Sequence, residues 1–250
     1  MRPIITLLTD FGTADGYVGE MKGMLLSLVS GVELVDITHD IPPQDVHAGR
    51  LTLARVWRRF PSGTLHIVVV DPGVGSDRAG LAVTSDEHIL VGPDNGVLSP
   101  ALLMAGACAI ELPVPPSAST TFHGRDVFVP AAAALARGEP LDSLGVQARD
   151  PIVLRTVEPV RDADGSLAGE VILIDRFGNA LTNLIGLRGG TIEVESTQIP
   201  LRRTYAEVAV GSPVAVVGSS GFIEIAVRDG DAAHRLGLTR GTRVVLRTSR

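Results

Sequence analysis

The sequence has a single cysteine and a single lysine, and each scarcity excludes a kind of chemistry. Cys108 lies in the apolar run AGACAIEL, so neither an internal disulfide nor a thiolate metal cluster can form. Lys22 lies in GYVGEMKGMLLSLV, whose helical spacing favours a surface helix over a Schiff base. No two histidines have the spacing of a metal site, so we expect no bound metal.

Long apolar runs and blocks of one charge are also absent. The 22 basic and 28 acidic residues give a net charge of −6 without a basic tail, which disfavours nucleic acid and anionic membranes as partners. The N-terminal segment MRPIITLLTDFG is typical of neither a signal peptide nor a membrane span. No Gly-x-Gly-x-x-Gly motif follows the first apolar run, and there is no Walker A loop. We therefore expect a globular, cytoplasmic protein without an ordinary nucleotide-phosphate site.

The first 157 residues alternate short β-rich runs with stretches of helical spacing. This pattern is typical of an α/β domain in which helices flank a largely parallel sheet. The expected strands are Ile4–Leu8, Glu33–Ile37, Leu65–Val70, Gly80–Thr84, His88–Val91 and Ala109–Leu112. The expected helices are Tyr17–Ser30, Val46–Phe60 and Val127–Arg137.

The last third of the chain has a different sequence pattern, with short runs of alternating apolar and polar residues separated by Gly, Asp, Asn and Pro. These runs are VILID, TIEVES, QIPLR, PVAVVG, FIEIAV and RVVLRT. They predict a smaller antiparallel β domain over residues 166–250. The polar stretch 158–165 is the expected linker between the two domains.

Polar residues follow three of the expected strands. Asp10 follows PIITLL, Asp71 follows HIVVV, and Asn95 comes shortly after HILVG. Ligands of open α/β sheets bind beyond the carboxyl ends of the strands, so these residues are the first candidates for a site. An aspartate at a strand end also often caps the following helix or turn, and for Asp10 both interpretations stay open.

Arg78 comes seven positions after Asp71, across the glycine-bearing turn DPGVGSDR. Such a turn can bring the two side chains together, either in a functional site or as a surface salt bridge worth roughly 0–1 kcal/mol. His123 lies in TFHGRDVF, where Arg125 and Asp126 have the default role of a helix-start pair. Spacing alone indicates only a two-domain protein with a polar cleft for a small ligand.

Seven segments in one order give the sequence a family resemblance. They are LLTDFGTADGYVGEMKG, VDITHDIPPQDVHAG, VVVDPGVGSDR, VGPDNGVLS, TFHGRDVF, IDRFGNALTN and SSGFIEIA. In them the chain resembles the hydroxide adenosyltransferases of S-adenosylmethionine (SAM), the hydrolytic relatives of the SAM-dependent fluorinating and chlorinating enzymes. The resemblance implies hydrolysis of SAM to adenosine and L-methionine without a cofactor. It also implies a homotrimer whose active sites lie between the first domain of one subunit and the second domain of the next.

The resemblance further implies roles for individual residues. Asp71, Arg78 and His123 match the trio assigned to the nucleophilic water. The implied substrate-binding residues are Asp10 for the ribose, Phe177 and Asn179 for the adenine side, and Asp175, Ser219 and Ser220 for the methionine end. Asn95 is a further candidate for substrate binding.

Departures from the fluorinating relatives narrow the expected reaction. Those enzymes have an aromatic residue in place of Asp71, which favours water over halide here. They also have tryptophan at the position of Leu181 and arginine at that of Ser220. A SAM-dependent halogenase and a non-catalytic adenosine or SAM sensor stay as alternatives.

Overall fold

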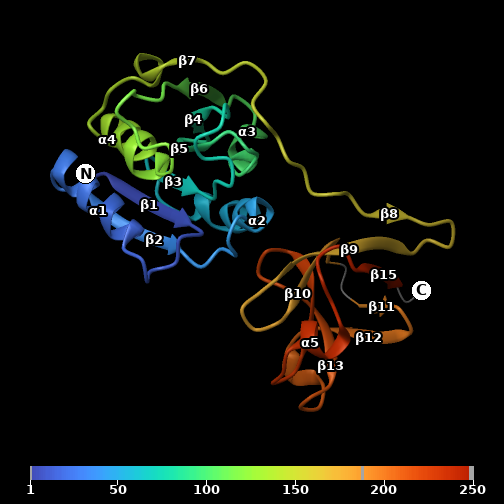
Figure 1. The fold of residues 1–250 in the computed structure, drawn as a ribbon. Coiled ribbons are helices and arrows are strands. Elements are labelled where there is room, and N and C mark those ends of the chain that lie inside the picture. Colours follow the sequence, from blue (N-terminus) through green and yellow to red (C-terminus); the bar gives the residue numbers. More distant parts are fainter. Residues whose placement is uncertain (1, 187–188, 248–250) are drawn as a thin grey trace. The chain divides into compact units, whose positions relative to one another are not determined.

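The computed structural model describes residues 2–186 and 189–247, which form two compact units divided between Leu154 and Arg155 (Figure 1). The stretch 158–165, expected as a linker, contains the short strand β8 (Val160–Arg161), which pairs with β9 (Leu167–Ile174) of the second unit. Within the described ranges, no helix is both long enough and apolar enough to cross a membrane.

The first unit is built on a seven-stranded mixed sheet. In spatial order its strands are β2 (Glu33–Thr38), β1 (Ile4–Thr9), β3 (Leu65–Val69), β5 (His88–Pro93), β4 (Gly80–Ser85), β6 (Cys108–Leu112) and β7 (Val146–Gln147). The pairings from β2 to β5 are parallel, and those from β5 to β7 are antiparallel. The prediction of a largely parallel sheet therefore holds for one half of the sheet only.

The hairpin between β4 and β5 explains this difference. Asp86 and Glu87 connect the two strands, with φ angles of 46° and 63°. Two successive residues in the left-handed region form the tight turn that joins antiparallel strands, whereas parallel strands need a long crossover. Neither residue is glycine or asparagine, so the sequence lacks the usual signal of this turn.

Helices cover both faces of the first sheet. They are α1 (Tyr17–Leu28), α2 (Val46–Val56), the short α3 (Ser99–Leu102) and α4 (Val129–Ala136), which follows a π-helical turn at Gly124–Phe128. Alternate residues of β1, Ile5 and Leu7, share one buried core with Met21 of α1 and Leu135 of α4. Both faces of the central strands are buried, which is why their sequences are nearly continuous apolar runs.

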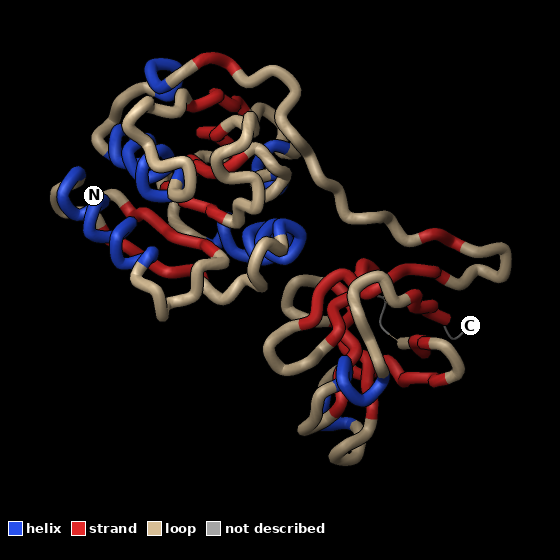
Figure 2. The backbone as a smooth tube through the Cα atoms, in the orientation of Figure 1, coloured by secondary structure: helices blue, strands red, loops and turns tan. Residues whose placement is uncertain are grey.

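The second unit is a closed β structure in which helix is confined to short segments (Figure 2). Its strands in spatial order are β10 (Ala180–Ile185), β14 (Phe222–Val227), β13 (Pro213–Val217), β12 (Thr197–Arg202), β11 (Thr191–Val194), β15 (Arg243–Arg247), β9 and β8. An additional pairing of β10 with β9 closes the sheet. Its helical segments are a 3₁₀ turn at Tyr205–Glu207 and α5 (Ala232–Leu236).

The prediction of an antiparallel second domain also holds in part. Among the strand pairings of the second unit's described residues, only that of β12 with β13 is parallel. The chain crosses between these two strands through residues 203–212, which is long enough to avoid a tight hairpin. Strand β10 was not among the expected strands, because Thr182 and Asn183 interrupt its apolar sequence.

Candidate active site

The carboxyl ends of β1, β3 and β5 lie at one edge of the first sheet. Asp10 directly follows β1, Asp71 comes two residues after the last residue of β3, and Asn95 comes two residues after that of β5. Because β3 pairs in parallel with both other strands, the three loops begin side by side. The structure thus brings together the three strand-end candidates that the sequence indicated.

Asp71 and Arg78 form a buried, two-pronged ion pair. Arg78 Nε donates to Asp71 Oδ1 at 2.9 Å, and Arg78 Nη2 donates to Asp71 Oδ2. The two side chains are only 4 % and 9 % exposed, respectively. The alternative of a surface salt bridge is therefore wrong. Removing one partner of such a buried pair leaves an uncompensated charge, at a cost of about 3–5 kcal/mol.

His123 joins this pair from the start of the π-helical turn, 45 residues further along the chain than Arg78. Its Nδ1 lies 2.8 Å from Arg78 Nη2. A guanidinium can only donate, so Nδ1 accepts, and the neutral ring carries its proton on Nε2. Burial lowers the pKa of His123, and the positive charge of Arg78 lowers it further against the opposing effect of Asp71. The ring is accordingly neutral at pH 7.

A glycine lets the Asp71–Arg78 loop approach the His123 loop. Gly75 has a φ of 77°, and a Cβ atom there would lie 2.3 Å from the carbonyl oxygen of Thr120. Any larger residue would push the two loops apart. The arrangement of Arg78 and His123 thus depends on a backbone contact three residues before His123.

Asp10 is held by a distant backbone group and does not cap the next helix. Its Oδ2 accepts a hydrogen bond of 2.7 Å from the backbone N–H of Gln44. The N-cap of α1 is Gly16, which makes no side-chain capping bond. Burial raises the pKa of Asp10 against the hydrogen bond from Gln44, and the nearby charge of Asp71 adds to the rise. Asp10 and Asp71 therefore lie in one electrostatic environment.

The third strand end differs from what the sequence suggested. The Asn95 side chain donates to the carbonyl of Val70 at 2.8 Å and accepts from the N–H of Val97 at 3.1 Å. These bonds tie the ends of β3 and β5 together. The neighbouring Asp94 has its pKa raised by burial and lowered in part by a hydrogen bond from Ile152 and by the charge of Arg78. Asp94 therefore interacts electrostatically with Arg78, which the sequence alone did not indicate.

An aromatic cluster beside these residues was also missed. Phe11 follows Asp10, Phe122 precedes His123, and their ring centroids lie 5.9 Å apart. Tyr17 contacts both rings, with centroid distances of 5.9 Å and 5.3 Å. In a chain with only 4 % aromatic residues, two aromatics adjacent to site candidates are the signal that could have indicated this cluster.

Three candidates of the second unit share the turn between β9 and β10. Asp175 Oδ1 accepts from the backbone N–H groups of Phe177 and Asn179, each at 2.9 Å. Asp175 Oδ2 accepts from the Asn179 side chain at 3.1 Å. The Phe177 side chain projects from this turn and is 75 % exposed. Hydrogen bonds within the turn thus fix its conformation, and the aromatic ring of Phe177 is exposed to solvent.

Ser219 and Ser220 lie in a different turn, between β13 and β14. Because β10 and β14 are antiparallel, this turn and the Asp175 turn lie at opposite ends of their pairing. Within residues 2–186 and 189–247, the buried Oγ of Ser220 has no hydrogen-bond partner. An unsatisfied buried hydroxyl is costly, and a ligand group is one way to satisfy it.

Glu224 and Tyr205 lie beside the turn of Ser219 and Ser220, and the sequence did not single them out. Tyr205 donates its hydroxyl to Glu224 Oε2 at 3.0 Å. The other carboxylate oxygen of Glu224 lies against Gly218, where a Cβ atom would come within 1.9 Å of it. Burial raises the pKa of Tyr205 to about 12, together with Glu224 and the charge of Asp175. Two carboxylates therefore act on one phenol.

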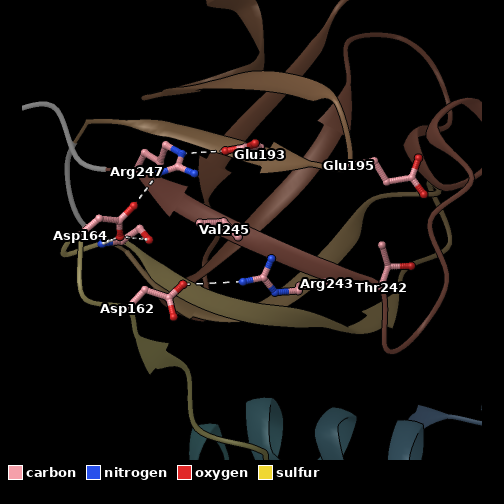
Figure 3. A pocket seen from close by; sticks show the side chains of 9 residues that line it. Asp162, Asp164, Glu193, Glu195, Thr242, Arg243, Val245 and Arg247 are labelled. Carbon is pink, nitrogen blue, oxygen red and sulfur yellow. Dashed lines mark hydrogen bonds and ion pairs between the residues drawn. The ribbon is translucent and has the colours of Figure 1, made fainter.

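A pocket of about 450 Å³ opens elsewhere on the second unit (Figure 3). Five of its charged side chains form ion pairs: Arg247 with Asp164 and Glu193, at 2.9 and 2.6 Å, and Arg243 with Asp162 at 3.6 Å. The site candidates do not line it. Across the described part of the chain, no cluster of His, Cys, Asp or Glu is suited to hold a metal ion.

The α/β unit with a polar sheet edge and the closed β unit define a class of two-part proteins, and comparison with known proteins gives the family. The model of the SAM hydroxide adenosyltransferase N-terminal domain matches residues 5–145, and that of the C-terminal domain matches residues 169–245. The chain belongs to the SAM hydroxide adenosyltransferase family.

Individual relatives agree with this assignment. The (R)-S-adenosyl-L-methionine hydrolase of Thermus thermophilus is 41 % identical, aligned over 98 % of this chain and 100 % of its own. The hydrolase of the same name from Salinispora tropica is 38 % identical over 97 % of each chain. A fluorinase from Actinopolyspora mzabensis is 28 % identical over 97 % and 96 %. The solved structure of an uncharacterized conserved protein from Thermotoga maritima has a TM-score of 0.88 at 32 % identity, covering 97 % and 99 % of the two chains.

Proposed function

We propose that this protein hydrolyses SAM to adenosine and L-methionine, by attack of water on the 5′ carbon of SAM. The hydrolases at 41 % and 38 % identity support this activity over that of the fluorinase at 28 %. The structural observation that carries it is the buried contact of Asp71, Arg78 and His123. It supplies fixed charges next to polar strand ends, where ligands of such sheets bind.

The chemistry demands most from the nucleophile. The sulfonium of SAM leaves as a neutral thioether and needs no acid, whereas water must be held about 3–3.5 Å from the carbon, opposite sulfur. The guanidinium of Arg78 favours the hydroxide-like form of a nearby water, and the carboxylate of Asp71 accepts its hydrogen bond or proton.

We assign His123 to holding Arg78 in place. The only unprotonated nitrogen of its neutral ring is already occupied by Arg78, so the ring has no free acceptor for a proton from water. The negative charge of Asp71 also disfavours a halide ion at the same position, which supports water over the halogenase alternative.

The substrate would contact both sets of candidates. We propose Asp10 as the acceptor of the ribose hydroxyls and Phe177 and Asn179 as the adenine-side residues. Asp175, Ser219 and Ser220 would take the methionine ammonium and carboxylate, which suits the unsatisfied Ser220 hydroxyl. Asn95 would act indirectly, since its amide holds two strand ends. No cofactor or metal enters this scheme.

Incubation of the purified protein with SAM in H₂¹⁸O tests the proposal. Mass spectrometry should find ¹⁸O in the 5′ hydroxyl of adenosine, with equimolar methionine. Asp71→Ala should lower the rate by about 10²–10⁴. The matched control, Asp77→Ala, removes an exposed aspartate from the same loop and should leave the rate unchanged. Tight adenosine binding without turnover would instead favour a sensor, and halogenated nucleoside in the presence of chloride or fluoride would favour a halogenase.

We also propose a homotrimer in which each site combines the first domain of one subunit with the second domain of the next, as the family resemblance implies. Light scattering should give three times the 26.2 kDa mass of the chain. Mixed Asp71→Ala and Asp175→Ala subunits should regain activity, because some sites then contain neither substitution. A monomeric mass would contradict this assembly. The cytoplasmic location stays a prediction from the sequence.

A further inference from the structure

His39 is a buried histidine that the proposed reaction does not use. It follows β2 by one residue, at the same sheet edge as Asp10, because β2 pairs in parallel with β1. Its Nδ1 lies 2.8 Å from the hydroxyl of Thr9, which is fully buried. Its Nε2 lies 3.1 Å from Asp36 Oδ1, off the line of a well-formed hydrogen bond.

These contacts link Phe11, Thr9, His39 and Asp36, and each group can act as a donor or acceptor that suits its neighbour. The Thr9 hydroxyl oxygen accepts from the backbone N–H of Phe11 at 3.3 Å, which leaves its own hydrogen free to donate to His39 Nδ1. Nε2 faces the carboxylate of Asp36, which can only accept, so the ring carries a proton on Nε2. Burial raises the pKa of Asp36, but the hydrogen bond from Lys22 and the contact with His39 outweigh this and hold it below its usual value. Asp36 is therefore an ionised partner for the ring.

His39 holds the segment around Asp10 through hydrogen bonds at two points. Its side chain acts through Thr9 on the N–H of Phe11, and its backbone carbonyl accepts from the N–H of Gly12 at 2.8 Å. Asp10 lies between these two attachment points. The third restraint on Asp10, the N–H of Gln44, comes from the loop that follows His39.

We propose that His39 is a positioning residue for Asp10, fixing its carboxylate by way of Thr9 so that it can receive the ribose hydroxyls of the substrate. The inference rests on the proposed role of Asp10 in the hydrolysis of SAM. In this inference, Nδ1 of the ring positions Asp10 through its bond to Thr9. The contact of Nε2 with Asp36 holds the ring itself in place.

Two substitutions of similar size separate this role from simple core packing. The amide of His39→Asn reaches the place of Nδ1 and can keep the bond to Thr9, whereas that of His39→Gln reaches the place of Nε2 and meets Asp36 instead. Adenosine binding, measured by calorimetry, is the readout because it needs no turnover. His39→Gln should bind adenosine about tenfold more weakly, the loss expected for one well-placed hydrogen bond. His39→Asn should stay within about twofold of the natural protein.

Thermal unfolding of the two variants provides the control for packing. Similar unfolding temperatures with different adenosine affinities support positioning through Nδ1. Equal affinities of the two variants, or weaker binding by His39→Asn than by His39→Gln, would overturn it.

A double-substitution cycle with Asp10→Asn tests whether His39 acts through Asp10. If it does, adding His39→Gln to Asp10→Asn should weaken adenosine binding by less than about twofold further, since the carboxylate being positioned is already gone. Independent, additive losses would contradict the inference. If Asp10→Asn alone leaves adenosine affinity unchanged, the ribose role of Asp10 fails. If Asp10→Asn loses affinity and His39→Gln keeps it, only the positioning role of His39 fails.

Discussion

The two units hold their candidate residues in opposite ways. In the first unit, Asp71, Arg78 and His123 are buried and bond to one another. In the second unit, Asp175 is satisfied by the backbone of its own turn, and Phe177 is exposed. Fixed, desolvated charges suit a chemical step, because they need no reorganisation during the reaction. An exposed ring on a self-ordered turn suits ligand binding, since its contacts form only when a partner arrives.

This comparison predicts different consequences for substitutions in the two units. A change in the buried trio should affect both stability and turnover, because the same ion pair serves both. A change in the exposed turn should affect substrate affinity and leave stability alone. A variant that breaks this separation would show that the division between chemistry and binding is wrong.

The largest effect is expected for Arg78→Ala. This change leaves Asp71 buried without a counter-charge, which should destabilise the first unit by about 3–5 kcal/mol. It should also lower kcat by about 10²–10⁴, because the charge that favours hydroxide is lost. Urea unfolding followed by the fluorescence of Trp57, the only tryptophan, reports on the first unit, and adenosine release gives the rate.

The control for this variant is Arg137→Ala, which removes an exposed arginine from the same unit. It should change stability by at most about 1 kcal/mol and leave kcat alone. A fall in stability for Arg78→Ala no larger than that of the control would show that the ion pair is not desolvated in solution.

The next largest effect is acid sensitivity confined to the first unit. His66 is fully buried against Thr6 and His88, and burial lowers its pKa to about 3. The unfolded chain takes up this proton near pH 6.5, so stability is complete above that pH and falls as the pH drops toward 3. Between pH 8 and pH 5 the loss from His66 should be about 2 kcal/mol.

Urea unfolding at both pH values, again followed by Trp57, checks this loss. His66→Gln should reduce the pH dependence of the free energy of unfolding, whatever its effect on stability at pH 8. The matched control, His234→Gln, removes the exposed histidine of the second unit and should not change it. An equal pH dependence in all three proteins would rule out His66 as its source.

The fold was predictable where local patterns decide it. The buried runs of β1 and β3 indicated their strands to within one residue, because strands buried on both faces must be apolar throughout. The antiparallel half of the first sheet was not predictable, since the Asp86–Glu87 turn lacks glycine and asparagine. The pairing of β9 with β10 that closes the second sheet depends on a strand whose apolar pattern Asn183 interrupts.

The candidate site shows the same limit. The spacing of Asp71 and Arg78 indicated a possible pair, but only the fold shows that it is buried. Strand-end position pointed to Asn95, whereas its neighbour Asp94 shares the field of Arg78. Glu224 lies within FIEIAV and reads as an ordinary outward-facing strand residue. Its importance comes from contacts with Tyr205 and Gly218 that no local pattern contains.

A smaller effect, on affinity alone, is expected for Phe177→Ala. The ring is 75 % exposed, so its loss should change the free energy of unfolding by at most about 0.5 kcal/mol. If the ring contacts adenine, KM should rise about fivefold with kcat nearly unchanged, because an aromatic contact is worth about 1 kcal/mol. Steady-state kinetics with SAM measure both constants. Phe177→Leu keeps an apolar side chain, so its KM should lie between those of the natural protein and Phe177→Ala. A drop in kcat with KM unchanged would place the ring in the chemical step instead.

The smallest effect is expected for Arg247→Ala, in the pocket of the second unit. Arg247 holds Asp164 and Glu193 from an exposed position, where water screens the charges, so the two ion pairs should contribute little to stability. Because this pocket contains no site candidate, kcat and KM for SAM should stay within experimental error of the natural protein. A clear rise in KM would show that the charged pocket takes part in substrate binding, and the binding surface of the second unit would then extend well beyond the Asp175 turn.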